Sequence, residues 1–68
     1  MNSDEYIAIT DALPPAEAQV AFNKACLELG VDLAKIDLRQ DVIVDTIRST
    51  RGMMRRYKIR KELLKPRG

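Results

Sequence analysis

Histidine is absent from this chain of 68 residues, and cysteine occurs once, at Cys26. A structural zinc site normally needs four thiolate or imidazole ligands, so the chain cannot build one, and it cannot form an internal disulfide. Without histidine, acid and base catalysis would fall to carboxylates, lysine or tyrosine, and no pair of these stands in an apolar context that would shift its protonation. These absences predict a protein that is not an enzyme and has no metal or cofactor.

Long apolar runs are also missing, because no stretch approaches the roughly 20 residues that a membrane-spanning helix requires. The early acidic residues Asp4 and Glu5 are unlike a signal peptide. A single thiol suits a reducing compartment better than a secreted disulfide scaffold. The sequence therefore predicts a cytoplasmic protein and argues against a membrane partner.

The small size limits the core that the chain can bury. A core in a chain of this length rarely contributes more than about 3 to 5 kcal/mol, so such chains usually add disulfides, a metal or a second subunit. Disulfides and zinc are excluded here. We expect one small helical domain over residues 1–68 that gains stability as a homodimer or on a larger partner.

Charge is abundant, and it is divided along the chain. Residues 1–47 contain nine acidic and three basic residues, whereas residues 48–68 contain nine basic residues and one acidic residue. The formal net charge of +2 conceals this division. Such a separation predicts a basic surface for an anionic partner, or a basic segment that folds back on the acidic one.

Local signals predict two helices in the acidic part. The clearer helix covers residues 15–29, where two prolines suit the first turn and Gly30 suits a left-handed C-cap. A shorter helix is predicted over about residues 3–12, with Asn2 and Glu5 near its start. The segment Tyr6 to Thr10 could instead form a short strand.

A third helix is predicted over about residues 38–65. Apolar and other residues recur there at alternating spacings of four and three, which is the pattern of a continuous helical seam. These residues are Ile43, Ile47, Thr50, Met54, Tyr57, Lys61 and Leu64. The resulting expectation is an all-α fold of three helices. A third helix about 42 Å long would expose more of its seam than the shorter helices cover, which predicts a helical homodimer.

Two other interpretations of this region remain open. Gly52 would cost about 1 kcal/mol inside a helix, so Ser49 to Gly52 could end one helix and Met53 begin another. The β-branched residues Val42 to Val44 could form an edge strand instead.

The basic third of the chain is the main candidate for function. The cations predicted to contact phosphates or an acidic protein surface are Arg48, Arg51, Arg55, Arg56, Lys58, Arg60 and Lys61. On a helix, Ile59 and Leu63 would form a strip that anchors in a partner groove. The residues predicted to form the core or dimer contact are Ile43, Ile47, Met54, Tyr57 and Leu64.

These features predict a small regulatory protein that binds nucleic acid through its basic C-terminal helix, in control of transcription. The alternative is an inhibitor or adaptor that docks the same helix onto a regulatory protein. If Asp41 and Asp45 neutralise the basic segment of a dimer mate, too little positive surface remains for strong phosphate binding, and the protein-binding alternative is favoured. A third interpretation is a solvated basic face that the acidic half of the molecule merely balances.

Overall fold

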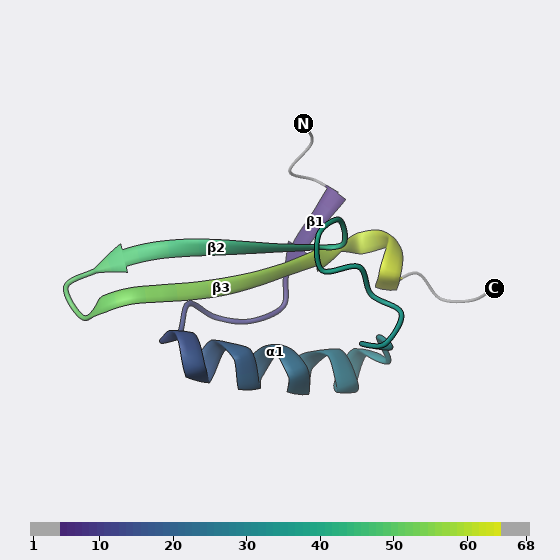
Figure 1. Cartoon of the computed structure of the whole chain (residues 1–68), viewed down its shortest axis with the longest axis horizontal. Coiled ribbons are helices and arrows are strands. Elements are labelled where there is room, and N and C mark those ends of the chain that lie inside the picture. The colour runs from purple at the N-terminus through teal and green to yellow at the C-terminus, as the bar shows by residue number, and fades with distance from the viewer. Residues whose placement is uncertain (1–4, 65–68) are drawn as a thin grey trace.

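The computed structural model describes residues 5–64, which form one helix, three strands and a terminal turn of 3-10 helix (Figure 1). The elements are β1 (Tyr6–Ala8), α1 (Pro15–Leu29), β2 (Val42–Ser49), β3 (Gly52–Arg60) and η2 (Lys61–Leu64). The strands form an antiparallel sheet in the order β1-β3-β2. The helix lies along one face of this sheet. The fold is α+β, so the prediction of an all-α fold is wrong.

The helix predicted over residues 15–29 is present with those bounds. Pro15 occupies the first turn, and Gly30 ends the helix in the left-handed conformation with φ 76°. The residues that face the sheet recur every four positions, as one stripe of a helix should. They are Ala18, Phe22 and Cys26, and all three are buried.

The helix predicted over residues 38–65 is wrong, because β2 and β3 form a hairpin there. The turn is Thr50–Arg51, and Ser49 pairs with Gly52 across it. Gly52 has φ 108°, a region that side chains disfavour, so it lies where the chain reverses rather than inside a helix. The β-branched residues of β2 favour extended backbone, and the apolar side chains Tyr57 and Ile59 alternate with basic ones. The alternative of an edge strand beginning at Val42 is confirmed.

The helix predicted over residues 3–12 is also wrong. The chain forms β1 instead, and Ile7 pairs with Ile59 of β3. The following segment stays beside β3, since Leu13 and Arg55 exchange two backbone hydrogen bonds of 3.0 and 2.7 Å. The alternative of a short strand that starts at Tyr6 is therefore confirmed.

A small core joins the helix to the sheet. Its buried residues are Ala18, Phe22, Cys26, Val42, Tyr57 and Ile59. The rings of Phe22 and Tyr57 have centroids 4.7 Å apart, and the Tyr57 hydroxyl donates to Gln19 Oε1 at 3.1 Å. The central strand β3 thus supplies the two largest side chains that the sheet contributes to the core. The helical homodimer loses its basis, because the long exposed helix from which we predicted it does not exist.

The hairpin extends beyond the part of the molecule that α1 supports. In Figure 1 the turn between β2 and β3 lies well past the first turn of α1. Within residues 5–64, the bridge between Leu13 and Arg55 is the backbone pairing of β3 with the segment before α1 that lies nearest the hairpin turn. We call residues 46–55 the distal half of the hairpin, which begins at the bridge of Arg55 and overhangs beyond it, and residues 42–45 with 56–60 its proximal half.

Candidate nucleic-acid interface

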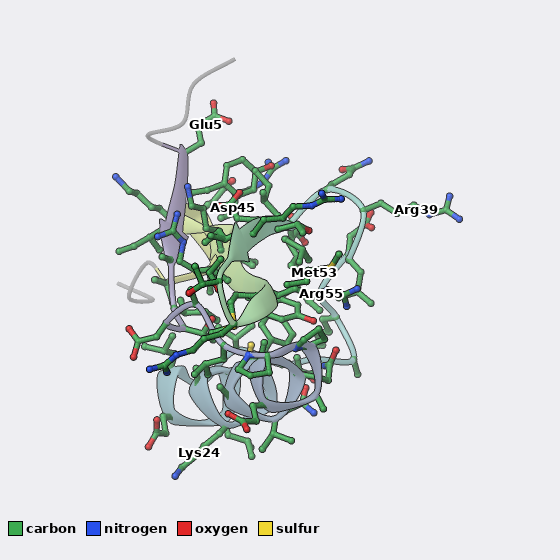
Figure 2. The ribbon with its side chains drawn as sticks, turned by 90° about the vertical axis from the view of Figure 1, so that its left-hand side faces the viewer. Glu5, Lys24, Arg39, Asp45, Met53 and Arg55 are labelled. Atoms are coloured by element: carbon green, nitrogen blue, oxygen red, sulfur yellow. The ribbon has the colours of Figure 1, made fainter. Side chains whose placement is uncertain are left out.

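Alternation along the strands sorts the basic residues of the hairpin onto two faces. Tyr57 and Ile59 point toward α1, so Arg56, Lys58 and Arg60 lie on the opposite, open face. Figure 2 looks along the hairpin from its turn, so that the two faces of the sheet and α1 can be told apart. Asp45 lies away from α1, whereas Met53 and Arg55 lie on the side of the helix.

The open face pairs its cations with acidic side chains. Asp45 lies directly across the sheet from Arg56. Its Oδ2 atom is 3.1 Å from Arg56 Nη2 and 3.4 Å from Lys58 Nζ. The hydrogen bond from Arg56, with a further contribution from Lys58, lowers the pKa of the Asp45 carboxyl below its ordinary value. Part of the positive charge of the proximal half is therefore cancelled within the chain itself.

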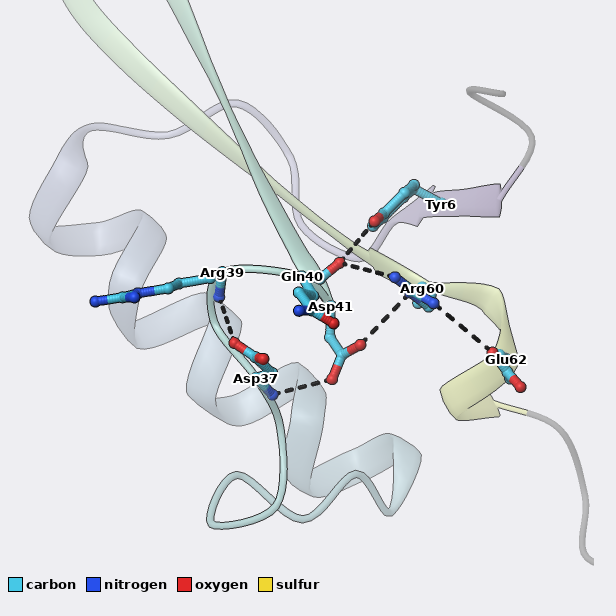
Figure 3. Close-up of polar contacts among 7 residues, drawn as sticks. All are labelled: Tyr6, Asp37, Arg39, Gln40, Asp41, Arg60 and Glu62. Atoms are coloured by element: carbon cyan, nitrogen blue, oxygen red, sulfur yellow. Dashed lines mark hydrogen bonds and ion pairs between the residues drawn. The ribbon is translucent and has the colours of Figure 1, made fainter. Parts of the chain in front are cut away.

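Arg60 is held in a second polar group at the end of β3 (Figure 3). Its Nε atom lies 3.5 Å from Asp41 Oδ1, and its Nη2 atom donates to the Gln40 carbonyl at 3.4 Å. The Tyr6 hydroxyl donates to the same carbonyl at 2.6 Å, and Glu62 Oε2 lies 4.0 Å from Arg60 Nη1. These contacts join β1, β3 and the loop before β2. Arg60 therefore has a structural role at the base of the hairpin.

Three arginines of the distal half have no such partners. Within residues 5–64, no acidic side chain lies within ion-pair distance of Arg48, Arg51 or Arg55. Arg48 and Arg51 are exposed, and Arg55 is half-buried. Lys61 is exposed too, but it begins η2 at the opposite end of the molecule from the turn. The structure thus divides the seven predicted cations into three unpaired distal arginines, three paired residues on the open face, and the separate Lys61.

Apolar side chains lie among these charges. Ile47 and Met54 are direct partners across the hairpin, and Ile43 lies on the same open face opposite Lys58. Met53 pairs with Arg48 and is 45% exposed. The distal half therefore offers both guanidinium groups and accessible methionine surface to a partner.

The predicted partner-groove anchors lie elsewhere. Ile59 is fully buried in the core, and Leu63 packs against that core from η2. Tyr57 is buried beside Phe22, and Leu64 also packs against the core. Ile59 thus belongs to the interior of this chain, and the partly buried Leu63 covers the core from η2. The sequence carries a signal for Ile59, because basic and apolar side chains alternate with a period of two over residues 56–60, as on a strand with one buried face.

Comparison with protein-family models, with curated proteins and with solved structures finds no match. Among residues 5–64, no helix has the length and apolar content needed to cross a membrane. The same residues include no cluster of histidine, cysteine, aspartate or glutamate side chains placed to hold a metal ion. The function therefore has to be argued from the charge and shape of the hairpin.

Proposed function

We propose that this protein binds nucleic acid through the β2–β3 hairpin and acts as a regulatory module without catalytic activity. The observation that carries the proposal is the group of unpaired arginines Arg48, Arg51 and Arg55 on the overhanging distal half. An unpaired guanidinium on a protruding element is available for a phosphate or a base edge. The charge on the hairpin is mostly positive, since Asp45 is the one acidic residue between Val42 and Arg60.

The shape of the element suits this partner. The major groove of B-DNA admits a two-stranded β-ribbon as well as a helix, and arginine makes bidentate hydrogen bonds with guanine there. Phosphate contacts made by Lys and Arg supply much of the affinity and steer association. Within the hairpin, Arg51 stands in the turn and Arg48 precedes it on β2, so both would enter the groove first. Met53 would supply apolar contact between them.

Control of transcription is the process in which we place this binding. The protein would act in the cytoplasm, where a single cysteine such as Cys26 stays reduced. Burial raises the pKa of the Cys26 thiol, which disfavours the nucleophilic thiolate. The alternative, docking onto a regulatory protein through the anchors Ile59 and Leu63, has lost those anchors to the core of this chain. We therefore favour nucleic acid over an acidic protein surface.

A titration with duplex DNA of mixed sequence tests the proposal. Fluorescence anisotropy would follow binding of the wild-type protein and of the triple variant R48A/R51A/R55A between about 50 and 200 mM salt, a range over which phosphate contacts weaken steeply. The variant should bind more weakly at every salt concentration. If all three arginines contact phosphates, the negative slope of log K against log salt should become shallower by about 2.7, since each contact contributes about −0.9.

The control variant K24A/K35A/R39A removes the same formal charge from exposed residues of α1 and the following loop. It should bind DNA nearly as the wild type does. Equal losses in the two triple variants would show that only net charge matters and that the hairpin is not the site. Absence of wild-type binding even at about 50 mM salt, where nonspecific binding is strong, would defeat the proposal.

A further inference from the structure

The outer edge of β2 is the longest unpaired edge of the sheet. β3 is the central strand, and no strand within residues 5–64 pairs with the other side of β2. β1, at the opposite edge, has only three residues, whereas β2 has eight. We infer that this edge of β2 pairs antiparallel with β2 of a second copy of the chain, which joins two sheets into one of six strands.

The backbone hydrogen bonds show which residues would form the contact. The Arg60 N–H donates to the Asp41 carbonyl at 2.9 Å, whereas the Tyr57 carbonyl accepts from Ile9 at 3.0 Å on the other side of β3. Because backbone groups of an antiparallel strand alternate between its two edges, odd-numbered residues of β2 bond to β3. The N–H and C=O groups that point outward belong to Val42, Val44, Thr46 and Arg48.

Natural proteins usually protect an exposed edge strand, and β2 lacks most of those protections, although it carries the charged residues Asp45 and Arg48. Proline, lysine, a bulge or a very short strand would discourage pairing with another chain. β2 contains no proline and no lysine, pairs with β3 in unbroken register, and is mostly β-branched. Val44 on this strand is 44% exposed, although it lies on the face that α1 partly covers. The outward backbone N–H and C=O groups of β2 are therefore available to a partner strand.

The order of residues in β2 argues that the partner is a second copy. The segment from Ile43 to Ile47 reads Ile-Val-Asp-Thr-Ile, which has nearly the same side chains in both directions about Asp45. In an antiparallel pair centred on Asp45, each Ile43 would lie opposite the partner's Ile47, and each Val44 opposite the partner's Thr46. Pairs of β-branched side chains stabilise neighbouring strands. A two-fold axis requires such self-complementarity, and an unrelated strand would not.

The same register sets the two Asp45 side chains opposite each other, which by itself would be unfavourable. Each carboxylate, however, already lies 3.1 Å from Arg56 Nη2 and 3.4 Å from Lys58 Nζ of its own chain. Four cations would therefore surround two carboxylates at the centre of the joined sheet. The ion pairs of the open face thereby offset the repulsion between the two Asp45 carboxylates that the two-fold axis brings together.

Hydrogen exchange measured by NMR on the wild-type protein tests the dimer directly. In a monomer, the outward amides of Val44 and Thr46 have no acceptor and exchange fast, whereas the inward amides of Ile43 and Ile47 are protected. Raising the protein concentration from about 10 µM to about 1 mM should slow exchange at Val44 and Thr46 about tenfold or more, while the inward amides change little.

A matched pair of variants gives a second test. Thr46→Pro removes an outward N–H that β3 does not use, and proline is tolerated on a free edge. Thr46→Val keeps that N–H. Sedimentation should show dimers for the wild type and Thr46→Val, and monomers for Thr46→Pro with an unchanged circular dichroism spectrum. If Thr46→Pro does not fold, the wild-type exchange data decide alone.

A wild-type protein that stays monomeric to about 1 mM, with fast exchange at Val44 and Thr46, would overturn the inference and leave the edge for a strand of another protein. A Thr46→Pro variant that dimerises as well as the wild type would also overturn it. These experiments contain no nucleic acid. The dimer and the DNA-binding proposal can therefore fail independently.

Discussion

The proximal and distal halves of the β2–β3 hairpin are made of the same two strands but have different surroundings. In the proximal half, one face packs Ile59 and Tyr57 against α1, and on the other face Asp45 pairs with Arg56 and Lys58. In the distal half, Arg48 and Arg51 are exposed and have no acidic partner among residues 5–64. One hairpin can therefore contribute to the core at its base and leave its other end free for binding.

The largest expected effect is a loss of folding when the proximal half loses its buried side chain. Ile59→Ala removes the fully buried centre of the core and should cost about 2 to 5 kcal/mol. This is comparable with the whole stability expected of a core this small, about 3 to 5 kcal/mol, so the variant should be largely unfolded. Circular dichroism and urea denaturation measure the effect.

Met53→Ala is the matched change in the distal half, since Met53 is 45% exposed. Its free energy of unfolding should stay within about 0.5 kcal/mol of the wild type, as for most surface substitutions. A similar loss in the two variants would show that the distal half is also part of the core.

Gly52→Ala tests whether the two halves fold together. The added Cβ would meet no atom within 4 Å, so the cost comes only from φ 108° at Gly52. Backbone strain of this kind costs about 1 to 3 kcal/mol. If the hairpin folds as a unit with the core, thermal denaturation should show this loss in full. Thr50→Ala, in the same turn but without positive φ, is the control and should change little.

A free energy of unfolding that is unchanged in Gly52→Ala would mean that the distal half opens without the core. The hairpin would then consist of two independent parts, and the distal arginines would be presented by a locally frayed ribbon.

Asp45→Asn should lower the free energy of unfolding by less than Ile59→Ala and Gly52→Ala do. The size of this loss should depend on pH. Partly exposed ion pairs contribute about 0.2 to 1 kcal/mol each, and Asp45 makes two of them. The pKa of Asp45 is lowered in the folded state, so its contribution is complete above its unfolded pKa of about 3.9 and is lost as the pH falls through the folded value. Urea denaturation from about pH 7 to about pH 2 should show the wild type and Asp45→Asn converging at the acidic end.

The smallest expected effect is a gain in DNA affinity for the same Asp45→Asn variant. The substitution removes the carboxylate that pairs with Arg56 and Lys58, so the open face of the proximal half becomes more positive. Anisotropy at low salt should show binding a few-fold tighter, with a salt slope steeper by up to about 0.9 per released cation that contacts a phosphate. Weaker binding would mean that the open face must be ordered by Asp45 before it can contact DNA.

How far the sequence predicts this protein depends on the range of the interactions involved. The helix over residues 15–29 was predicted with the observed bounds, because prolines and a C-terminal glycine act within one turn. The hairpin was missed because residues such as Ile43, Ile47 and Met54 fit a helical spacing as well as a strand. Thr50 to Gly52 interrupts that spacing only if the chain reverses there, and nothing local forces it to reverse.

The sequence names the seven cations from which the candidate site is drawn, but not how they are arranged. Their separation into paired and unpaired groups depends on Asp45, which meets Arg56 only across the hairpin. Ile59 was predicted to face a partner because on a helix it lies opposite Tyr57. On a strand the two residues share one face, and that face is the core.

The sequence by itself determined the helix α1, the absence of histidine and disulfide chemistry, and the concentration of positive charge after residue 47. These are properties of composition or of a few neighbouring residues. Only the tertiary structure decided that the basic segment is the centre of a sheet, which of its arginines have acidic partners, and which edge is unpaired. Strand pairing joins residues that are far apart in the chain, so its hydrogen bonds form only once the whole fold brings them together.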